Sequence, residues 1–213
     1  MTTEKMTIVS ALSELKVLNS RISEEIATAT FCDVNKHVMR TLKGKSLNDA
    51  RAEMQGSYDK ITALINRNNA IKKAVTKANA ETYVKIGDEQ MTIAEAIYMK
   101  QTGIELIRQL LMVMTSQYTK ARTTIERNNG DALTQNCEAY IVKLFGAGDN
   151  KSVSADIEAA KAKYIEENTV DLIEGVDTAK AIETLKNKID TFEANVDAAI
   201  TVANATTTIE ISY

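Results

Sequence analysis

The chain has 213 residues, of which 44% are hydrophobic and 26% are charged, proportions typical of one folded domain or one elongated bundle. It contains no Pro and 8 Gly, which permits long helices without the commonest helix breaker. The formal net charge of −3 gives no electrostatic reason to expect a nucleic-acid partner, which would require a basic surface.

The sequence carries no targeting signal that we can identify. Residues 1–6 lack the apolar stretch of a signal peptide, and no apolar run approaches the roughly 20 residues of a membrane-spanning helix. We therefore expect cytoplasmic synthesis without a signal peptide, and no membrane partner. The two cysteines, Cys32 and Cys137, fit neither a disulfide framework nor a zinc site. We therefore expect both to be buried and to pack as small hydrophobic residues.

The first helix is predicted over residues 7–26. Thr7 is its N-cap, because apolar residues follow Thr7 at spacings of three and four. Residues 28–34 are rich in β-formers and predict a short strand or extended segment. Residues 35–45 are polar, end near a glycine and predict a loop.

The second helix is predicted to start near Ser46 and is strongest over residues 58–78. Gly56 is a place where it could be interrupted. Two short strands follow, at residues 81–86 and 89–91. A Gly-Asp pair separates them, which is a signal for a two-residue hairpin turn.

The central helix is predicted over residues 92–128. Thr92 and Glu95 have the spacing of a capping box, in which each side chain satisfies a free backbone N–H group of the first turn. The middle of this helix is apolar on several faces, which indicates that other helices surround it. We expect four residues of the central and last helices to be buried: Ile107, Leu111, Ile189 and Phe192.

Two further helices are predicted after the central one, at residues 131–145 and 154–167, with a loop at 146–150 between them. Residues 169–173 resemble a strand. The last helix is predicted over residues 178–203, with Asp177 or Thr178 as its cap.

Two pairs of segments resemble each other: 6–12 and 91–97, and 78–86 and 203–211. Each half of the chain therefore has the order helix, extended segment, helix, strand. This order predicts a mainly α fold, an elongated up-down-up-down four-helix bundle of the coiled-coil type with small β-hairpin and strand elements at its ends. We expect a single domain over residues 1–213, with an inserted helical segment at about residues 130–168.

The sequence shows no catalytic constellation. His37 is the only histidine, lies in a predicted loop and has no nucleophile or carboxylate at motif spacing, so we expect a surface residue. Phosphate-binding, dinucleotide-binding and EF-hand spacings are absent. We therefore predict that the protein is not an enzyme and that it has no metal and no cofactor.

One polar pattern occurs twice, at residues 65–70 and 125–130. Four of its residues are candidates for a polar core that fixes helix register through hydrogen bonds: Arg67, Asn68, Arg127 and Asn128. A ligand site built from Arg67 and Asn68 is the alternative.

The chain ends on residues 206–211, an alternating β-type tail with Ile209 and Ile211 on one face. Thr207, Ile209 and Ile211 are candidates for an assembly strand, because an unpaired strand edge tends to find a partner. The tail can pair within its own subunit, where residues 82–86 offer a partner, or it can bridge subunits. The second alternative predicts a homo-oligomer or a larger protein assembly.

Three segments of the chain are similar to the septicolysin-like family of small bacterial and phage helical proteins: 61–69, 91–97 and 176–207. The resemblance covers most of the chain except the insertion at 130–168. It implies an elongated helical bundle with small β elements, and it assigns no catalytic residues.

These observations predict a non-catalytic structural or assembly protein, such as a phage virion component, that acts through oligomeric helical and β-edge contacts. The alternative, suggested by the family resemblance, is a membrane-active pore-forming protein of the cytolysin type. No segment has the length or alternation of a membrane-spanning element, which favours the first interpretation.

Overall fold

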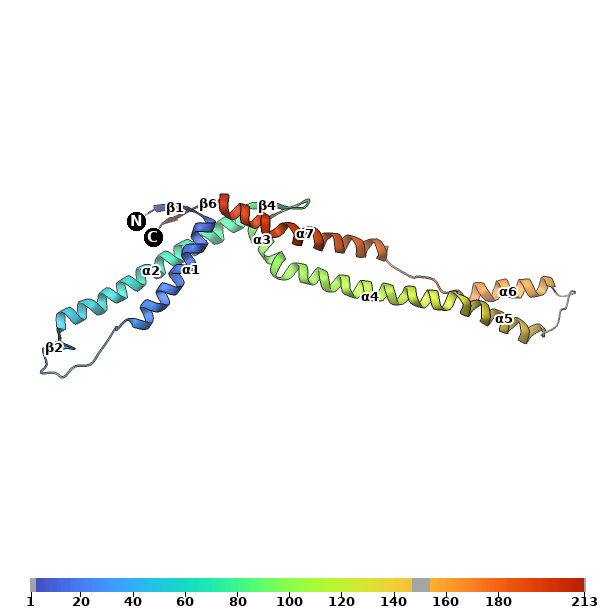
Figure 1. Cartoon of the computed structure of the whole chain (residues 1–213), viewed down its shortest axis with the longest axis horizontal. Helices are drawn as coiled ribbons and strands as arrows, with labels where there is room; N and C mark the ends of the chain where they lie inside the picture. Colours follow the sequence, from blue (N-terminus) through green and yellow to red (C-terminus); the bar gives the residue numbers. More distant parts are fainter. Residues whose placement is uncertain (1–2, 147–153, 213) are drawn as a thin grey trace. The chain divides into compact units, whose positions relative to one another are not determined.

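The computed structural model describes residues 3–146 and 154–212, which are mainly helical (Figure 1). Their contacts divide into two compact units, one formed by Met1–Gln101 with Thr191–Tyr213 and the other by Thr102–Asp190. The helix α7 (Thr178–Thr206) contributes its last part to the first unit and its first part to the second. Because one continuous helix belongs to both units, this division does not test the predicted single domain over residues 1–213.

The first unit contains both ends of the chain. Its further elements are β1 (Thr3–Thr7), α1 (Ile8–Thr28), β2 (Thr41–Leu42), β3 (Lys45–Ser46), α2 (Leu47–Glu81), β4 (Tyr83–Ile86), β5 (Glu89–Thr92), α3 (Ile93–Tyr98) and β6 (Thr208–Ser212). The described strands form antiparallel pairs, β1 with β6, β2 with β3, and β4 with β5. The predicted first and second helices and the predicted hairpin are confirmed, and α2 runs through Gly56 without interruption.

The second unit is built from helices. Its elements are α4 (Ile104–Asn129), α5 (Asp131–Phe145) and α6 (Ser154–Asn168), together with the first part of α7. A π-helical stretch, η1 (Met99–Gly103), joins α3 to α4, and the sequence gives no signal for it. The helices predicted at 131–145, 154–167 and 178–203 are confirmed, and the predicted central helix over 92–128 is formed by α3, η1 and α4 in succession. Of the loop predicted at 146–150, residues 147–150 lie outside the described residues.

Side chains at the helix starts act as N-caps, among them those of Thr7 and Thr92, as predicted. The hydroxyl oxygens of Thr7 and Ser46 accept hydrogen bonds from the backbone N–H groups of Ser10 (3.2 Å) and Asp49 (3.1 Å). Thr92 and Glu95 form the complete capping box: Thr92 Oγ1 accepts from Glu95 N (3.2 Å), and Glu95 Oε2 accepts from Thr92 N (2.7 Å). A further residue caps α7 in the same way: Asp177 Oδ1 accepts from Lys180 N at 3.0 Å.

The core of the first unit lies along α1 and α2. Buried residues recur every three or four positions on α1, and the same spacing returns near the end of α2, so the two helices pack lengthwise. These residues are Ile8, Ala11, Leu15 and Leu18 on α1, and Ile61, Ile71 and Val75 on α2. Full burial of one such large side chain contributes about 1.5–3 kcal/mol.

Two predicted strands are absent from the described residues. Residues 29–36 have no regular structure and residues 169–174 are likewise irregular, so neither segment forms a strand. The strand predicted at 169–173 is therefore wrong, and of the two alternatives for 28–34, a strand or an extended segment, the strand is wrong. A strand needs a hydrogen-bonded neighbour, and β propensity alone does not provide one. In the second segment, the side-chain amide of Asn129 takes that place: its Oδ1 accepts from Val170 N (2.9 Å), and its Nδ2 donates to Val170 O (2.7 Å).

The burial predicted for the central helix is only partly correct. Ile189 and Phe192 of α7 are buried as predicted, with 4% and 5% of their surface exposed. Ile107 and Leu111 are half-buried, which corrects the prediction that they are buried. Within α4, all of whose residues the structure describes, Ile104 alone is buried. Periodicity identifies an apolar face, but it does not supply the helix that covers it.

The tail forms β6, as predicted, but its partner is β1 rather than residues 82–86. No strand was predicted at β1, whose five residues are mostly polar and end on Thr7, the cap of α1. The hairpin β4–β5 and the pair β1–β6 have equivalent registers. Val84 is opposite Met91, and Ile209 is opposite Met6, which are the positions that the internal sequence similarity equates.

We expect two glycine substitutions in the first unit to change stability in opposite directions. Gly56→Ala in α2 should raise the free energy of unfolding by about 0.5–1 kcal/mol, because alanine favours helix and nothing lies within 4 Å of the added Cβ. Gly87→Ala in the β4–β5 turn should lower it by at least about 1 kcal/mol. Gly87 has φ +61°, and its Cβ would lie 2.5 Å from Thr191 Cγ2. Urea unfolding in dilute solution, followed by circular dichroism, measures both, and a destabilising Gly56→Ala would contradict the continuity of α2.

The capping box should make stability depend on pH. Hydrogen bonds from Thr92, the backbone N–H first, hold the pKa of Glu95 below its ordinary value of 4.5. The charged carboxylate therefore stabilises the folded state above that value, and this contribution is lost as the pH falls through the lower pKa of the folded state. Comparison of Glu95→Gln with the unmodified chain should show a stability difference at neutral pH that disappears in acid. An equal difference at every pH would contradict a role for the charge.

Candidate functional site

Arg67 of α2 connects three elements of the first unit. Its Nε donates to Glu14 Oε1 on α1, and its Nη2 lies 3.0 Å from Glu4 Oε2 on β1. The hydrogen bond to Glu14 is the largest of several effects that raise the pKa of Arg67 above its ordinary value. With its side chain 20% exposed, Arg67 is the least exposed member of this triad, which we call the Arg67 triad.

Asn68 occupies an apolar position in the face of α2 that packs on α1. Its Nδ2 donates to Asn19 Oδ1 at 2.8 Å, so the two amides bridge the helix pair. Together with the Arg67 triad, this contact sets polar atoms of α1 and α2 opposite each other at fixed positions. A hydrogen bond of this kind is directional, unlike apolar packing, and can therefore select one register.

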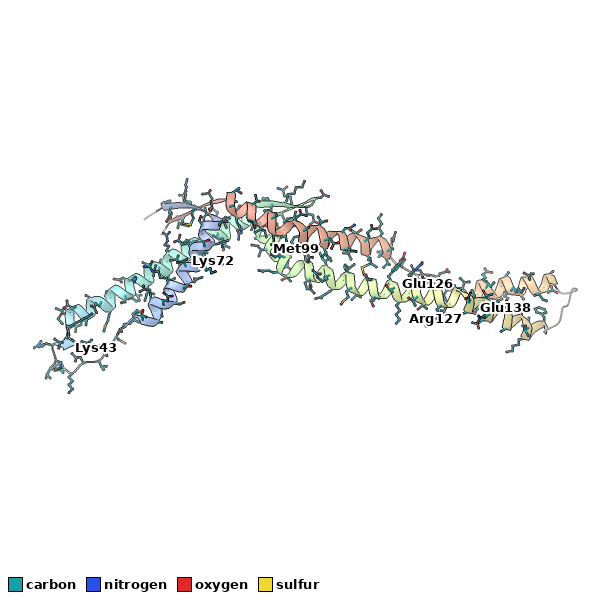
Figure 2. The ribbon with its side chains drawn as sticks, viewed as in Figure 1. Lys43, Lys72, Met99, Glu126, Arg127 and Glu138 are labelled. Carbon is teal, nitrogen blue, oxygen red and sulfur yellow. The ribbon has the colours of Figure 1, made fainter. Side chains whose placement is uncertain are left out.

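The structure does not give the second copy of the polar pattern an equivalent environment. Arg127 and Asn128 are exposed near the end of α4, where Figure 2 labels Glu126 and Arg127. Both belong to the second unit, whereas Arg67 and Asn68 belong to the first. The next residue, Asn129, makes the contact with Val170 instead, and its only sequence signal was the Asn-Asn-Gly end of the helix.

The candidate assembly strand lies in β6 and just before it. Ile209 and Ile211 are 5% and 1% exposed, and Thr207 is partly exposed immediately before β6. The Thr207 carbonyl oxygen accepts from Ile8 N at 3.1 Å, which ties the end of α7 to the start of α1. The apolar face of the strand is therefore used within the chain.

The histidine and the cysteines form no common site. His37 is exposed in its loop, as predicted. Cys137 is buried in α5, but Cys32 is exposed, which corrects the prediction that both are buried. Cys32 lies in the segment where the predicted strand is absent, so no neighbouring strand covers it.

One hollow in the first unit lies between the end of α1, the β2–β3 turn and the start of α2. Its charged residues are paired with each other: Lys43 Nζ lies 2.8 Å from Asp33 Oδ2, and Lys45 Nζ lies 2.5 Å from Glu53 Oε1. The hydrogen bond from Lys43 holds the pKa of Asp33 below its ordinary value. Figure 2 labels Lys43 at this turn. These pairs neutralise the charges that would otherwise select an ionic ligand.

Within residues 3–146 and 154–212, no three His, Cys, Asp or Glu side chains gather as metal ligands would. Among the helices of that same part of the chain, none combines the length and the apolar character needed to cross a membrane. Comparison with family models, curated proteins and solved structures finds no match for this chain. The resemblance to the septicolysin-like family therefore stays a prediction.

The Arg67 triad should contribute more to stability than the exposed ion pair on the same two helices. Arg67→Met should lower the free energy of unfolding by about 1.5–3 kcal/mol, the range for hydrogen bonds to charged groups. The matched control is Lys60→Met, which removes the more exposed pair with Glu25 and should cost less than about 1 kcal/mol. A double-mutant cycle with Glu14→Gln measures the coupling directly. Equal losses for Arg67→Met and Lys60→Met would contradict a register-fixing role.

Proposed function

We propose that this protein is a non-catalytic structural or assembly protein that works as a homo-oligomer or within a larger assembly, such as a phage virion. The observation that carries the proposal is an exposed apolar stripe on α4. Leu106, Leu110 and Val113 are 56%, 51% and 47% exposed and lie at spacings of four and three, so they share one face of the helix. We call these three residues the α4 stripe.

An exposed apolar face of this kind supports a protein interface. Contiguous apolar surface on a monomer is unfavourable in water, and proteins retain it mainly where a partner covers it. Leu110 also lines a shallow groove with Met114, and Ala181 and Leu185 of α7 form its other side. A helix laid on this face would cover both the stripe and the groove.

The predicted up-down-up-down four-helix bundle belongs to the same proposal. The other helices of the second unit cover only part of the apolar surface of α4, since Ile104 is the one residue of α4 that is buried. Helices contributed by partner proteins would supply the missing neighbours. The β edges add a second kind of contact, because β1 and β6 pair only with each other among the described strands and each keeps one free edge.

A charged residue in the α4 stripe should abolish association through that stripe without unfolding the chain. Leu110→Glu places a carboxylate in the proposed interface, where it would be desolvated without a partner. Thr119→Glu is the matched control, because Thr119 is exposed and lies nine residues, or about two and a half turns, beyond Leu110 on the opposite face. Light scattering measures the mass of each variant, and circular dichroism checks the helices. The proposal would be overturned if the unmodified protein is monomeric at high concentration and no other protein is bound to it when it is purified from its source.

A further inference from the structure

The chain contains the same strand pair twice, once with a connecting turn and once without. Between β4 and β5, Tyr83 is opposite Thr92 and Lys85 is opposite Gln90. Between β6 and β1, the equivalent residues Thr208 and Thr7 are opposite each other, as are Glu210 and Lys5. Gly87 and Asp88 join the first pair, whereas the second pair is made by the two ends of the chain, which Figure 1 marks beside β1 and β6. A connecting turn is therefore not needed for this register.

The equivalence extends into the flanking helices. Ile93 N donates to Thr82 O (2.9 Å), and Ile8 N donates to Thr207 O (3.1 Å). The N–H groups of the same two threonines, Thr82 and Thr207, each donate, at 2.8 Å, to the carbonyl oxygens of Ala78 and Ala203. Within residues 3–146 and 154–212, the two buried side-chain oxygens without a hydrogen-bond partner are also equivalent, since they belong to Asn79 and Asn204.

Two halves of the chain therefore complement each other through two equivalent contacts. The first half, residues 3–86, ends in β4 and begins with β1. The second half, residues 89–212, begins with β5 and ends in β6. Each half supplies one strand to each pair, so a first half from one copy fits a second half from another copy as well as it fits its own.

The connection between the halves is a tight two-residue turn. Gly87 has φ +61°, and Asp88 is not among the residues with positive φ, a combination that fits a type II′ turn. A single residue, Thr207, separates α7 from β6, and both its N–H and its carbonyl oxygen are hydrogen-bonded. If two copies exchanged β6 alone, the chain would have to bend at Thr207 and these hydrogen bonds would break. If they exchange a whole half, the hydrogen bonds are kept and only the turn at Gly87 and Asp88 changes.

We propose that two copies of this chain exchange halves at Gly87–Asp88. In the exchanged dimer, β4 of one copy pairs with β5 of the other, and β1 pairs with β6 in the same way. Residues 83–92 then run as one strand beside the same strand of the second copy, and the dimer is closed by two-fold symmetry. This inference rests on the proposed assembly function and names its partner as a second copy of the chain.

Single-cysteine variants test which chain supplies each strand. In a background with Cys32→Ser and Cys137→Ala, one chain carries Lys5→Cys and another, with a different affinity tag, carries Glu210→Cys. The two full-length chains are produced in the same cells. Lys5 and Glu210 are exposed, and their ion pair spans 3.6 Å, so the replacements should cost little. Cα atoms of opposite residues lie about 4.5–5.5 Å apart, which suits a disulfide.

Three further combinations make the outcome decisive. Lys85→Cys with Gln90→Cys is the equivalent pair in the other hairpin, and Lys5→Cys with Gln90→Cys is the unmatched control. A chain that carries both cysteines of one matched pair shows whether a disulfide can form between the two strands at all. We expect disulfide-linked dimers from both matched mixtures and none from the control.

Several results would overturn the proposal. Intrachain bridging without any bridging in the mixtures would show that the strands do not exchange. Bridging at positions 5 and 210, but not at 85 and 90, would show exchange of terminal strands alone. If light scattering finds a dimer but no disulfides form between chains, the exchange is overturned and the proposed assembly function is left intact. If light scattering finds a monomer, both the exchange and the assembly function are overturned.

A turn variant provides an independent measurement. Gly87→Ala should raise the dimer fraction severalfold at equal concentration, because the strained turn is absent from the exchanged dimer. Gly44→Ala is the control, since Gly44 is also a turn glycine, with φ +83° and nothing within 4 Å of the added Cβ. Gly44→Ala should leave the dimer fraction unchanged. A Gly87→Ala protein that is destabilised but not more dimeric would contradict the proposed hinge.

Discussion

The pairing of the two terminal strands is the constraint on which the first unit depends. α1 begins at Ile8, directly after β1, and one residue separates α7 from β6, so the five register pairs determine where α1 starts and where α7 ends. The strands also carry apolar side chains into the core: Ile211 is 1% exposed, and Ile8, at the junction of β1 and α1, is fully buried. Separation of the strands would expose apolar surface at both ends of the chain at once.

Features encoded within a few neighbouring residues could be predicted from the sequence. Thr7, Ser46 and Thr92 were recognised as helix starts because a cap depends on residues no more than three positions apart. Residues 28–34 and 169–173 form no strand despite their β propensity, because a strand depends on a partner that the local sequence does not specify. β1 was missed for the same reason, since its partner is about two hundred residues away in the chain.

The candidate polar residues show the same limit. Asn68 was recognisable because it interrupts an apolar face, and such a position requires a hydrogen-bonding partner. Its partner Asn19 and the carboxylates of the Arg67 triad could not be identified, because they lie on other elements. The pattern recurs at Arg127 and Asn128, but both residues are exposed, whereas Arg67 and Asn68 are partly buried.

The contact between Asn129 and Val170 has a chemical consequence. Asn129 is followed by Gly130, where a Cβ would lie 2.9 Å from the Glu126 carbonyl oxygen, so the small residue is needed for this helix end. An asparagine before glycine is open to attack by the following backbone nitrogen, which leads through a cyclic imide to an acid. Such deamidation would replace the Nδ2 donor with a carboxylate oxygen facing the Val170 carbonyl, and the two oxygens would repel each other. The junction between α4 and the segment before α7 is thus a site where chemical ageing of the protein would loosen its structure.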